Sequence, residues 1–227
     1  MPLPHSTAEA DISPTGEHLC RVCATEGSGC CRTDPSITHL CFPLSLPEWR
    51  RMLPYVSLAT PSPESSALFD AEDETAHQAL LALERQPPGI HLEFASAVPA
   101  ENDPIGSFER NSEEFIGSMH ALFPNQKRRI EHLFGKQPQH LALRTRVDGS
   151  CVFLGTGGCR LPRKARPWYC LLFPFWVLSD SVTIFLPEDC LLAKRAKSPG
   201  EGMRLLETGP EDVRAFFKAL TQDWGLV

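Results

Sequence analysis

Cysteines are the residues of this chain whose type and spacing could support chemistry. The chain has nine cysteines in 227 residues, and eight of them form two groups. The first group is Cys20, Cys23, Cys30 and Cys31, and the second is Cys151, Cys159, Cys170 and Cys190. Four thiolates bind a zinc ion at ~2.3 Å, and thiolates are also the ligands of iron–sulfur clusters. A chain of this length buries a core without crosslinks, so we predict that this eight-cysteine set binds metal, and the alternative is that the cysteines are free thiols.

The spacing of the first group favours a ligand loop. Close spacing lets one loop present several thiols at a small ordering cost, and Gly27 and Gly29 permit the positive φ angles that such loops use. Adjacent cysteines do not both face one ion without a special turn, so we expect either Cys30 or Cys31 to point to a second metal or into the core. The ninth cysteine, Cys41, lies outside the pattern and is expected in the core.

The expected cellular compartment also favours metal binding by the cysteines over disulfide formation. Residues 1–17 lack a basic stretch followed by an apolar one, so they do not resemble a secretory signal and are expected to be a flexible tail. The longest apolar run, 168–178, is eleven residues long and contains Pro174, whereas a membrane span needs about 20. We therefore expect a cytoplasmic protein that crosses no membrane. Export by another route would make up to four disulfides the alternative.

The charge of the chain argues against nucleic acid as the main partner, because a net charge of −6 does not suit a phosphate backbone. A local exception is the sequence RLPRKAR, which places four cations between two cysteines of the second group. These cations are Arg160, Arg163, Lys164 and Arg166. They would favour thiolate forms, and the alternative is a solvated loop that contacts nothing. The sequence identifies no protein partner.

The elements that must position the cysteines are predicted mostly as helices. Ser45 and Glu48 form a capping-box pattern that opens a helix ending at Pro54. Apolar residues at helical spacing predict a second helix at 67–86. The pair Asn111 and Glu114 opens a third at 111–135, which Pro124 must kink or split. A last helix at 210–224 is predicted with Thr208 and Glu211 as its cap.

In the second half of the chain, the spacing of the apolar residues changes from a helical period to the alternation that is typical of strands. Residues 141–147 and 150–154 alternate as strands do, and Asp148 and Gly149 between them favour a tight hairpin turn. Another strand is expected at 181–187. We therefore predict an α+β fold in which a small antiparallel β-hairpin sheet and several helices surround a cysteine metal centre. It is expected to be one domain, 18–227, with a mainly helical insert at about 60–140.

The cysteine pattern resembles that of the YkgJ-like cysteine-cluster family, whose bacterial members are described as zinc- or iron-chelating. The resemblance rests on the vicinal cysteines at 30–31, the sequence CVFL that begins at Cys151, and above all RPWYCLLFP at 166–174. Cys190 matches a later family cysteine. The resemblance implies that all eight cysteines of the two groups are metal ligands and that Arg166 belongs to the cofactor site.

Ligand type does not separate zinc from an iron–sulfur cluster, since both accept four thiolates. A dry aromatic wall suits a cluster, and the second group lies among several aromatic residues. They are Phe153, Trp168, Tyr169, Phe173, Phe175 and Trp176. We therefore favour iron–sulfur slightly over zinc, while the same aromatics could also be ordinary core residues.

Three functions stay open at this point. The first is a metal-binding protein whose centre is structural, and the second is electron transfer or metal delivery. The third is an S-adenosylmethionine-dependent protein lysine N-methyltransferase, because the resemblance extends to flagellin lysine methylases. A methyltransferase needs a glycine-rich loop between a strand and a helix. The glycines at 155–158 link two cysteines instead, and we expect them to form a turn.

Overall fold

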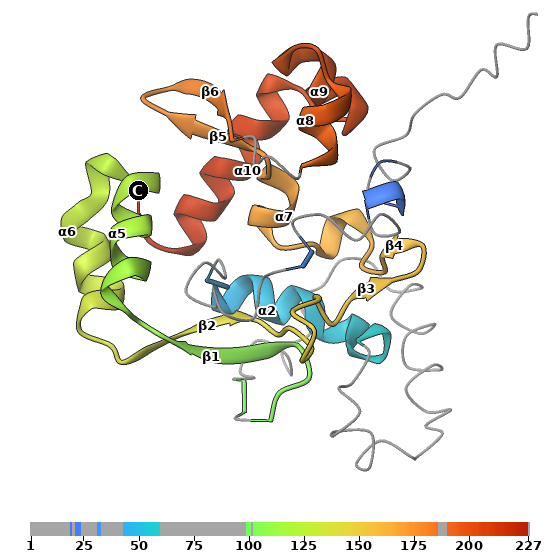
Figure 1. Ribbon diagram of the computed structural model, residues 1–227. Helices are drawn as coiled ribbons and strands as arrows, with labels where there is room; N and C mark the ends of the chain where they lie inside the picture. Colours follow the sequence, from blue (N-terminus) through green and yellow to red (C-terminus); the bar gives the residue numbers. More distant parts are fainter. Residues whose placement is uncertain are drawn as a thin grey trace, which may run out of the picture.

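Figure 1 shows the computed structural model of the chain. The structure describes residues 19, 21–23, 31–32, 43–59, 99–100, 102–185 and 190–226. Three of the nine cysteines, Cys20, Cys30 and Cys41, lie outside these residues. The predicted tail at 1–17 and the predicted helix at 67–86 also lie outside them.

The described elements mix helices with short antiparallel strands, which confirms the α+β prediction. The first half contains α2 (Leu46–Met52), the 3₁₀ helix η2 (Leu53–Leu58), β1 (Gly106–Arg110), α5 (Glu113–Leu122), η4 (Pro124–Gln126), α6 (Lys127–Ile130), the π-helical turn η5 (Glu131–Gly135) and β2 (Gln139–Leu143). The second half contains β3 (Leu154–Gly155), β4 (Gly158–Cys159), η6 (Arg163–Ala165), α7 (Trp168–Leu172), β5 (Phe175–Leu178), β6 (Ser181–Ile184), α8 (Leu191–Arg195), α9 (Pro199–Leu205) and α10 (Pro210–Asp223).

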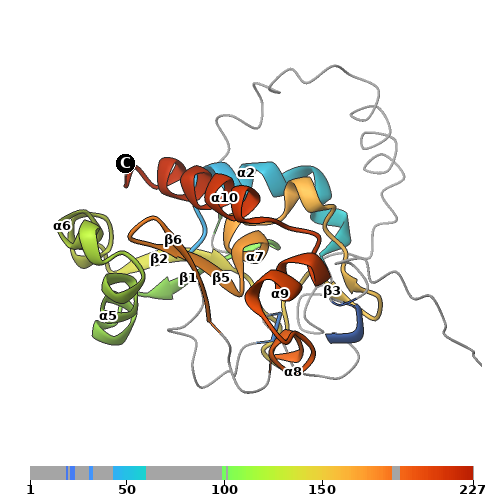
Figure 2. The same ribbon diagram turned by 90° about the horizontal axis from the view of Figure 1, so that it is seen from above.

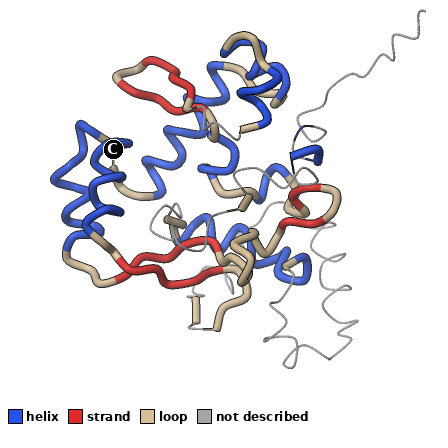
Figure 3. The backbone as a smooth tube through the Cα atoms, viewed as in Figure 1, coloured by secondary structure: helices blue, strands red, loops and turns tan. Residues whose placement is uncertain are grey.

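The strands form three separate two-stranded sheets, which Figure 3 shows as three short red pairs. β1 pairs with β2, β3 with β4, and β5 with β6, all antiparallel. The predicted strand at 181–187 is confirmed over β6, but its partner β5 was not predicted. Ser179 and Asp180 join β5 to β6 with φ angles of 48° and 66°. This two-residue turn lacks the glycine or asparagine that usually reveals such a hairpin in a sequence.

The predicted hairpin at 141–154 is only partly correct. Its turn forms as expected, because the Gly149 N–H donates to the Arg146 carbonyl at 2.9 Å and Gly149 has a φ of 75°. The strand at 139–143 takes its ladder from β1, however, and beyond it only Thr145 and Cys151 form a bridge across the turn. Strand β1 was not predicted from the sequence, because its five residues, GSFER, show no strong alternation of apolar and polar residues.

The helix starts are partly as predicted. The capping box of Ser45 and Glu48 is confirmed, and the α-helix ends at Met52, after which Pro54 lies inside a 3₁₀ helix. The cap of α5 is Ser112, so the prediction of Asn111 was wrong. The Asn111 amide instead donates to the carbonyls of Phe134 and Gln137.

The start of the last helix also differs by one residue from the prediction. The Asp212 carboxylate accepts the Gly209 N–H at 2.8 Å, so Thr208 and Glu211 are not the cap. A proline at the first helical position suits this start, since its missing N–H has no intrahelical partner there. Pro124 does split the third predicted helix, because α5 ends at Leu122 and the chain continues as η4 and α6.

Two clusters of buried apolar residues form the core. The first core joins α5, α6, α7, β5 and the C-terminal helices around Phe115, Leu172 and Trp176. The second core joins α2 to the segment 152–165 around Trp49, Met52 and Phe153. The Trp49 indole N–H donates to the Asp103 carboxylate at 3.0 Å, which satisfies the one polar group of that side chain.

Helix α7 is anchored between the two cores. Figure 1 shows it between α2 and α10, and Figure 2 shows α2 beside α10 from above. From α2, the buried Glu48 carboxylate accepts the Trp168 main-chain N–H at 2.7 Å, and the Arg51 guanidinium lies 4.0 Å from the Trp168 ring centre. From α10, the Asp223 carboxylate accepts the Trp168 indole N–H at 2.7 Å. The first residue of α7 is therefore held from both sides.

We predict that Glu48→Gln destabilises the protein. One Glu48 oxygen accepts the Ser45 N–H and hydroxyl, and the other accepts the Trp168 N–H. Because one oxygen becomes an NH₂ group, a buried donor loses its acceptor, which costs about 1–3 kcal/mol. Urea unfolding measures the change. Glu211→Gln is the control, since Glu211 is 91% exposed and pairs only with Arg214, and equal midpoints for the two variants would contradict the prediction.

Candidate metal centre

The two cysteine groups meet through the main chain. The Cys151 N–H donates to the Cys31 carbonyl at 2.8 Å, and Arg32 and Ser150 form an antiparallel bridge. A longer contact of 4.0 Å joins the Arg32 guanidinium to the Asp148 carboxylate. Residues about 120 positions apart in the sequence therefore lie side by side.

Four thiols lie close enough to change one another's charge state. They are Cys31, Cys151, Cys159 and Cys170, and they come from three segments of the chain. In every pair among them, a negative charge on one thiol raises the pKa of another. Cys31 is thus grouped with three cysteines that lie far from it in the sequence.

Burial is the main cause of the pKa shifts. It raises the pKa of Cys151 from 9.0 to about 12, with a further rise from Cys31. Burial also raises the pKa of Cys159, opposed by the Arg166 guanidinium. The pKa of Cys170 lies well above 9.0, because protein surrounds its thiol and the other three cysteines are near, although part of the residue's surface is exposed. In the absence of a cation, the thiols of Cys151, Cys159 and Cys170 are therefore neutral at pH 7.

Main-chain amides point at two of the sulfurs. The Phe153 N–H donates to the Cys151 sulfur at 3.4 Å, and the Leu161 N–H donates to the sulfur of Cys159. In both cases the donor lies two residues after the cysteine. Such bonds favour the thiolate and orient it, as hydrogen bonds to sulfur do in metal–thiolate sites.

The turn before Cys151 positions this cysteine. The Asp148 carboxylate accepts the Ser150 N–H at 3.0 Å, so Asp148 belongs to the turn, as predicted. The Arg146 guanidinium then donates to the carbonyls of Val152 and Leu154, at 3.2 and 2.6 Å. Because this positive charge also lowers the pKa of Cys151, Arg146 both shapes the loop and opposes the effect of burial. Sequence reasoning missed Arg146, which lies outside the basic run.

A short hairpin positions Cys159. Leu154 pairs with Cys159 and Gly155 with Gly158, so residues 156–157 form the turn. Gly158 has a φ of 98°, a conformation that favours glycine. This confirms that the glycines at 155–158 make a turn, and they open no helix after a strand. The methyltransferase alternative gains no support from them.

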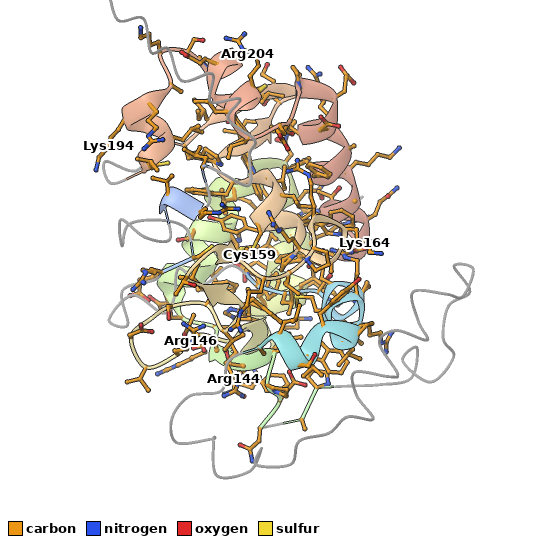
Figure 4. The ribbon with its side chains drawn as sticks, turned by 90° about the vertical axis from the view of Figure 1, so that its right-hand side faces the viewer. Arg144, Arg146, Cys159, Lys164, Lys194 and Arg204 are labelled. Carbon is orange, nitrogen blue, oxygen red and sulfur yellow. The ribbon has the colours of Figure 1, made fainter. Side chains whose placement is uncertain are left out.

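Cys170 reaches the group from α7. It lies in the first turn of that helix, which Glu48 holds at Trp168. Leu172 on the same helix is buried in the first core, whereas Cys151 and Cys159 pack against the second core. Cys151, Cys159 and Cys170 thus lie where the two cores meet. Figure 4 shows the right-hand side of the molecule, with Cys159 near the middle of the view.

The structure places Arg166 beside Cys159. Its Nε donates to the Leu161 carbonyl at 3.0 Å, and its guanidinium also forms a hydrogen bond with the Cys159 thiol, which lowers the pKa of that thiol. The Arg166 carbonyl accepts from Arg51 at 3.1 Å. Arg166 therefore lies next to one of the predicted metal ligands.

Of the other predicted ligands, two pack against the first core and two lie outside the described residues. Cys23 and Cys190 pack against the first core. Cys20 and Cys30 are not among the described residues. Within the described residues, no set of three or more His, Cys, Asp or Glu side chains has the arrangement of a metal site. The four thiols influence one another, but their sulfurs are not gathered as ligands of one ion.

Comparison with known proteins adds no identification. No family model matches the chain, and neither the curated proteins nor the solved structures give a match. Among the described helices, none has the length and apolar character that a bilayer crossing requires.

We predict that Cys151 reacts slowly with iodoacetamide in the folded, metal-free chain. Alkylation requires the thiolate, and burial raises the pKa of Cys151 to about 12, so its rate should still be rising above pH 10. In the urea-unfolded chain, the rate should level off once the pH passes the ordinary value of 9.0. Mass spectrometry of the Cys151 peptide measures both profiles. A folded-state profile that levels off near pH 9 would contradict the prediction.

Proposed function

We propose that the protein binds a metal centre through Cys31, Cys151, Cys159 and Cys170. The observation that supports this proposal most directly is that four thiols from three segments of the chain lie near enough for a charge on one to raise the pKa of another. Four like charges gathered in a poorly solvated place repel one another, so the set is stable as thiolates only with a cation between them. A zinc ion or an iron–sulfur cluster supplies that positive charge, and the thiols would then release their protons on binding.

The donor set fits a thiophilic metal. It consists of sulfur from three segments, with an N–H donor aimed at Cys151 and another at Cys159. Closing the four sulfurs on one centre requires side-chain rotation, which the staggered wells of χ1 permit. The cost of joining distant segments would be offset by the metal–thiolate bonds.

The proposed role is structural or redox, in the cytoplasm, where reducing conditions keep the thiols available. Bound zinc would link the segment at 31–32 to the segment 150–170, and a bound iron–sulfur cluster would in addition accept an electron. We slightly favour iron–sulfur, because the fully buried Phe153 and the buried Leu161 keep water from the amides that face the sulfurs. Membership of the YkgJ-like cysteine-cluster family is part of the same proposal.

We predict that Cys170→Ser loses metal and stability together. The serine hydroxyl is a poor ligand for a thiophilic metal, so the centre would lose one of four bonds and the link between α7 and the second core. Elemental analysis and an absorption spectrum on protein purified without air measure the content, and thermal unfolding measures the stability. Cys41→Ser is the matched control, expected to keep both.

The metal itself is identified in the same measurement. Iron and acid-labile sulfide in similar amounts, with a broad band near about 400 nm, would indicate a cluster. Zinc without colour would indicate a structural ion. Full metal content in Cys170→Ser, or no metal in the unaltered chain, would contradict the proposal.

A further inference from the structure

A cavity lies directly beside Cys159. Its volume is about 220 Å³. It is lined by Arg21, Gly157, Cys159, Arg160, Leu161, Pro162 and Arg166. Cys159, Leu161 and Arg166 already belong to the surroundings of the proposed metal centre, whereas Arg21 and Arg160 have no role in that proposal.

The described lining contains three guanidinium groups and no carboxylate. Arg21 comes from the helical residues at 21–23, Arg160 follows β4, and Arg166 precedes α7. The chain as a whole is acidic, with a net charge of −6, so three arginines around one hollow are not a consequence of its composition. A local positive potential in an acidic protein attracts a small anion more than it attracts a polyanionic chain.

Two of the arginines are oriented by the main chain. Arg166 Nε donates to the Leu161 carbonyl at 3.0 Å, and Arg160 Nη2 donates to the Val152 carbonyl at 3.4 Å. A guanidinium has five N–H donors in a fixed plane, so a bond of this kind sets the direction of the whole group. Planar forks of this type bind carboxylate and phosphate groups through paired N–H donors.

We propose that this cavity is a binding site for a small oxyanion, either a carboxylate or a phosphate group, held by Arg21, Arg160 and Arg166 against Cys159. The volume admits a small molecule and excludes a nucleic-acid strand. The inference does not require a metal at the four thiols. A competing role for the same arginines is to balance the negative charge of the thiolates, and the experiment separates the two.

The experiment is isothermal titration calorimetry of the full-length protein with inorganic phosphate and, separately, with citrate. Chloride keeps the ionic strength constant, because electrostatic binding weakens with salt. The metal content of each sample is measured in parallel. We expect saturable binding of one anion per chain, and the stronger of the two titrations identifies the phosphate or the carboxylate class.

Variants assign the binding to the cavity. Arg160→Gln and Arg21→Gln should each weaken binding about tenfold or more, since each removes a charge-assisted pair of hydrogen bonds. Both side chains are exposed, so both variants should fold. Lys164→Gln is the control, because Lys164 is an exposed cation of the same loop that does not line the cavity.

Three results would overturn the proposal. One is the absence of saturable binding of both anions, and another is an equal loss of binding in Lys164→Gln. The third is a fall in metal content in Arg160→Gln with anion binding unchanged, which would assign the arginines to charge balance at the thiols. Anion binding by a chain that contains no metal would reject the metal centre and leave this site standing.

Discussion

The arrangement of the site depends on the hydrogen bond between the buried Glu48 carboxylate and the Trp168 main-chain N–H. This carboxylate closes the start of its own helix at Ser45 and accepts the first N–H of α7 at Trp168. Because Cys170 lies in that first turn, its distance from Cys151 and Cys159 is fixed by α2 as much as by α7. Burial raises the pKa of Glu48, so the three hydrogen bonds to its oxygens have to offset the cost of keeping a charge there.

Charge compensation is the second constraint on the site. Thiols that raise one another's pKa are grouped with two arginines that lower it, Arg146 for Cys151 and Arg166 for Cys159. Each arginine also donates to main-chain carbonyls, so its charge is held in place by the loop that it stabilises. The same residues thus set both the shape and the potential of the loops that contain the cysteines.

The sequence predicted the parts of this site that depend on local chemistry. The capping box at Ser45, the turn at Asp148 and Gly149, and the glycine turn at 155–158 are all present, because side chains and main chain within a few residues decide them. The partner of β2 was missed, since β1 lies far from it in the sequence and shows no alternation. The roles of Arg146 and the Glu48 contact with Trp168 were also missed, since spacing gives no information on contacts across the fold.

The main-chain bond between Cys31 and Cys151 has a consequence for the timing of assembly. These residues are about 120 positions apart, so the first cysteine leaves the ribosome well before its partner. At about 5–20 residues per second, the interval is on the order of ten seconds. During biosynthesis the early thiols therefore encounter the cell's metals and oxidants without the rest of the fold around them. The four-thiol group can therefore assemble only after residues 151–170 have been synthesised.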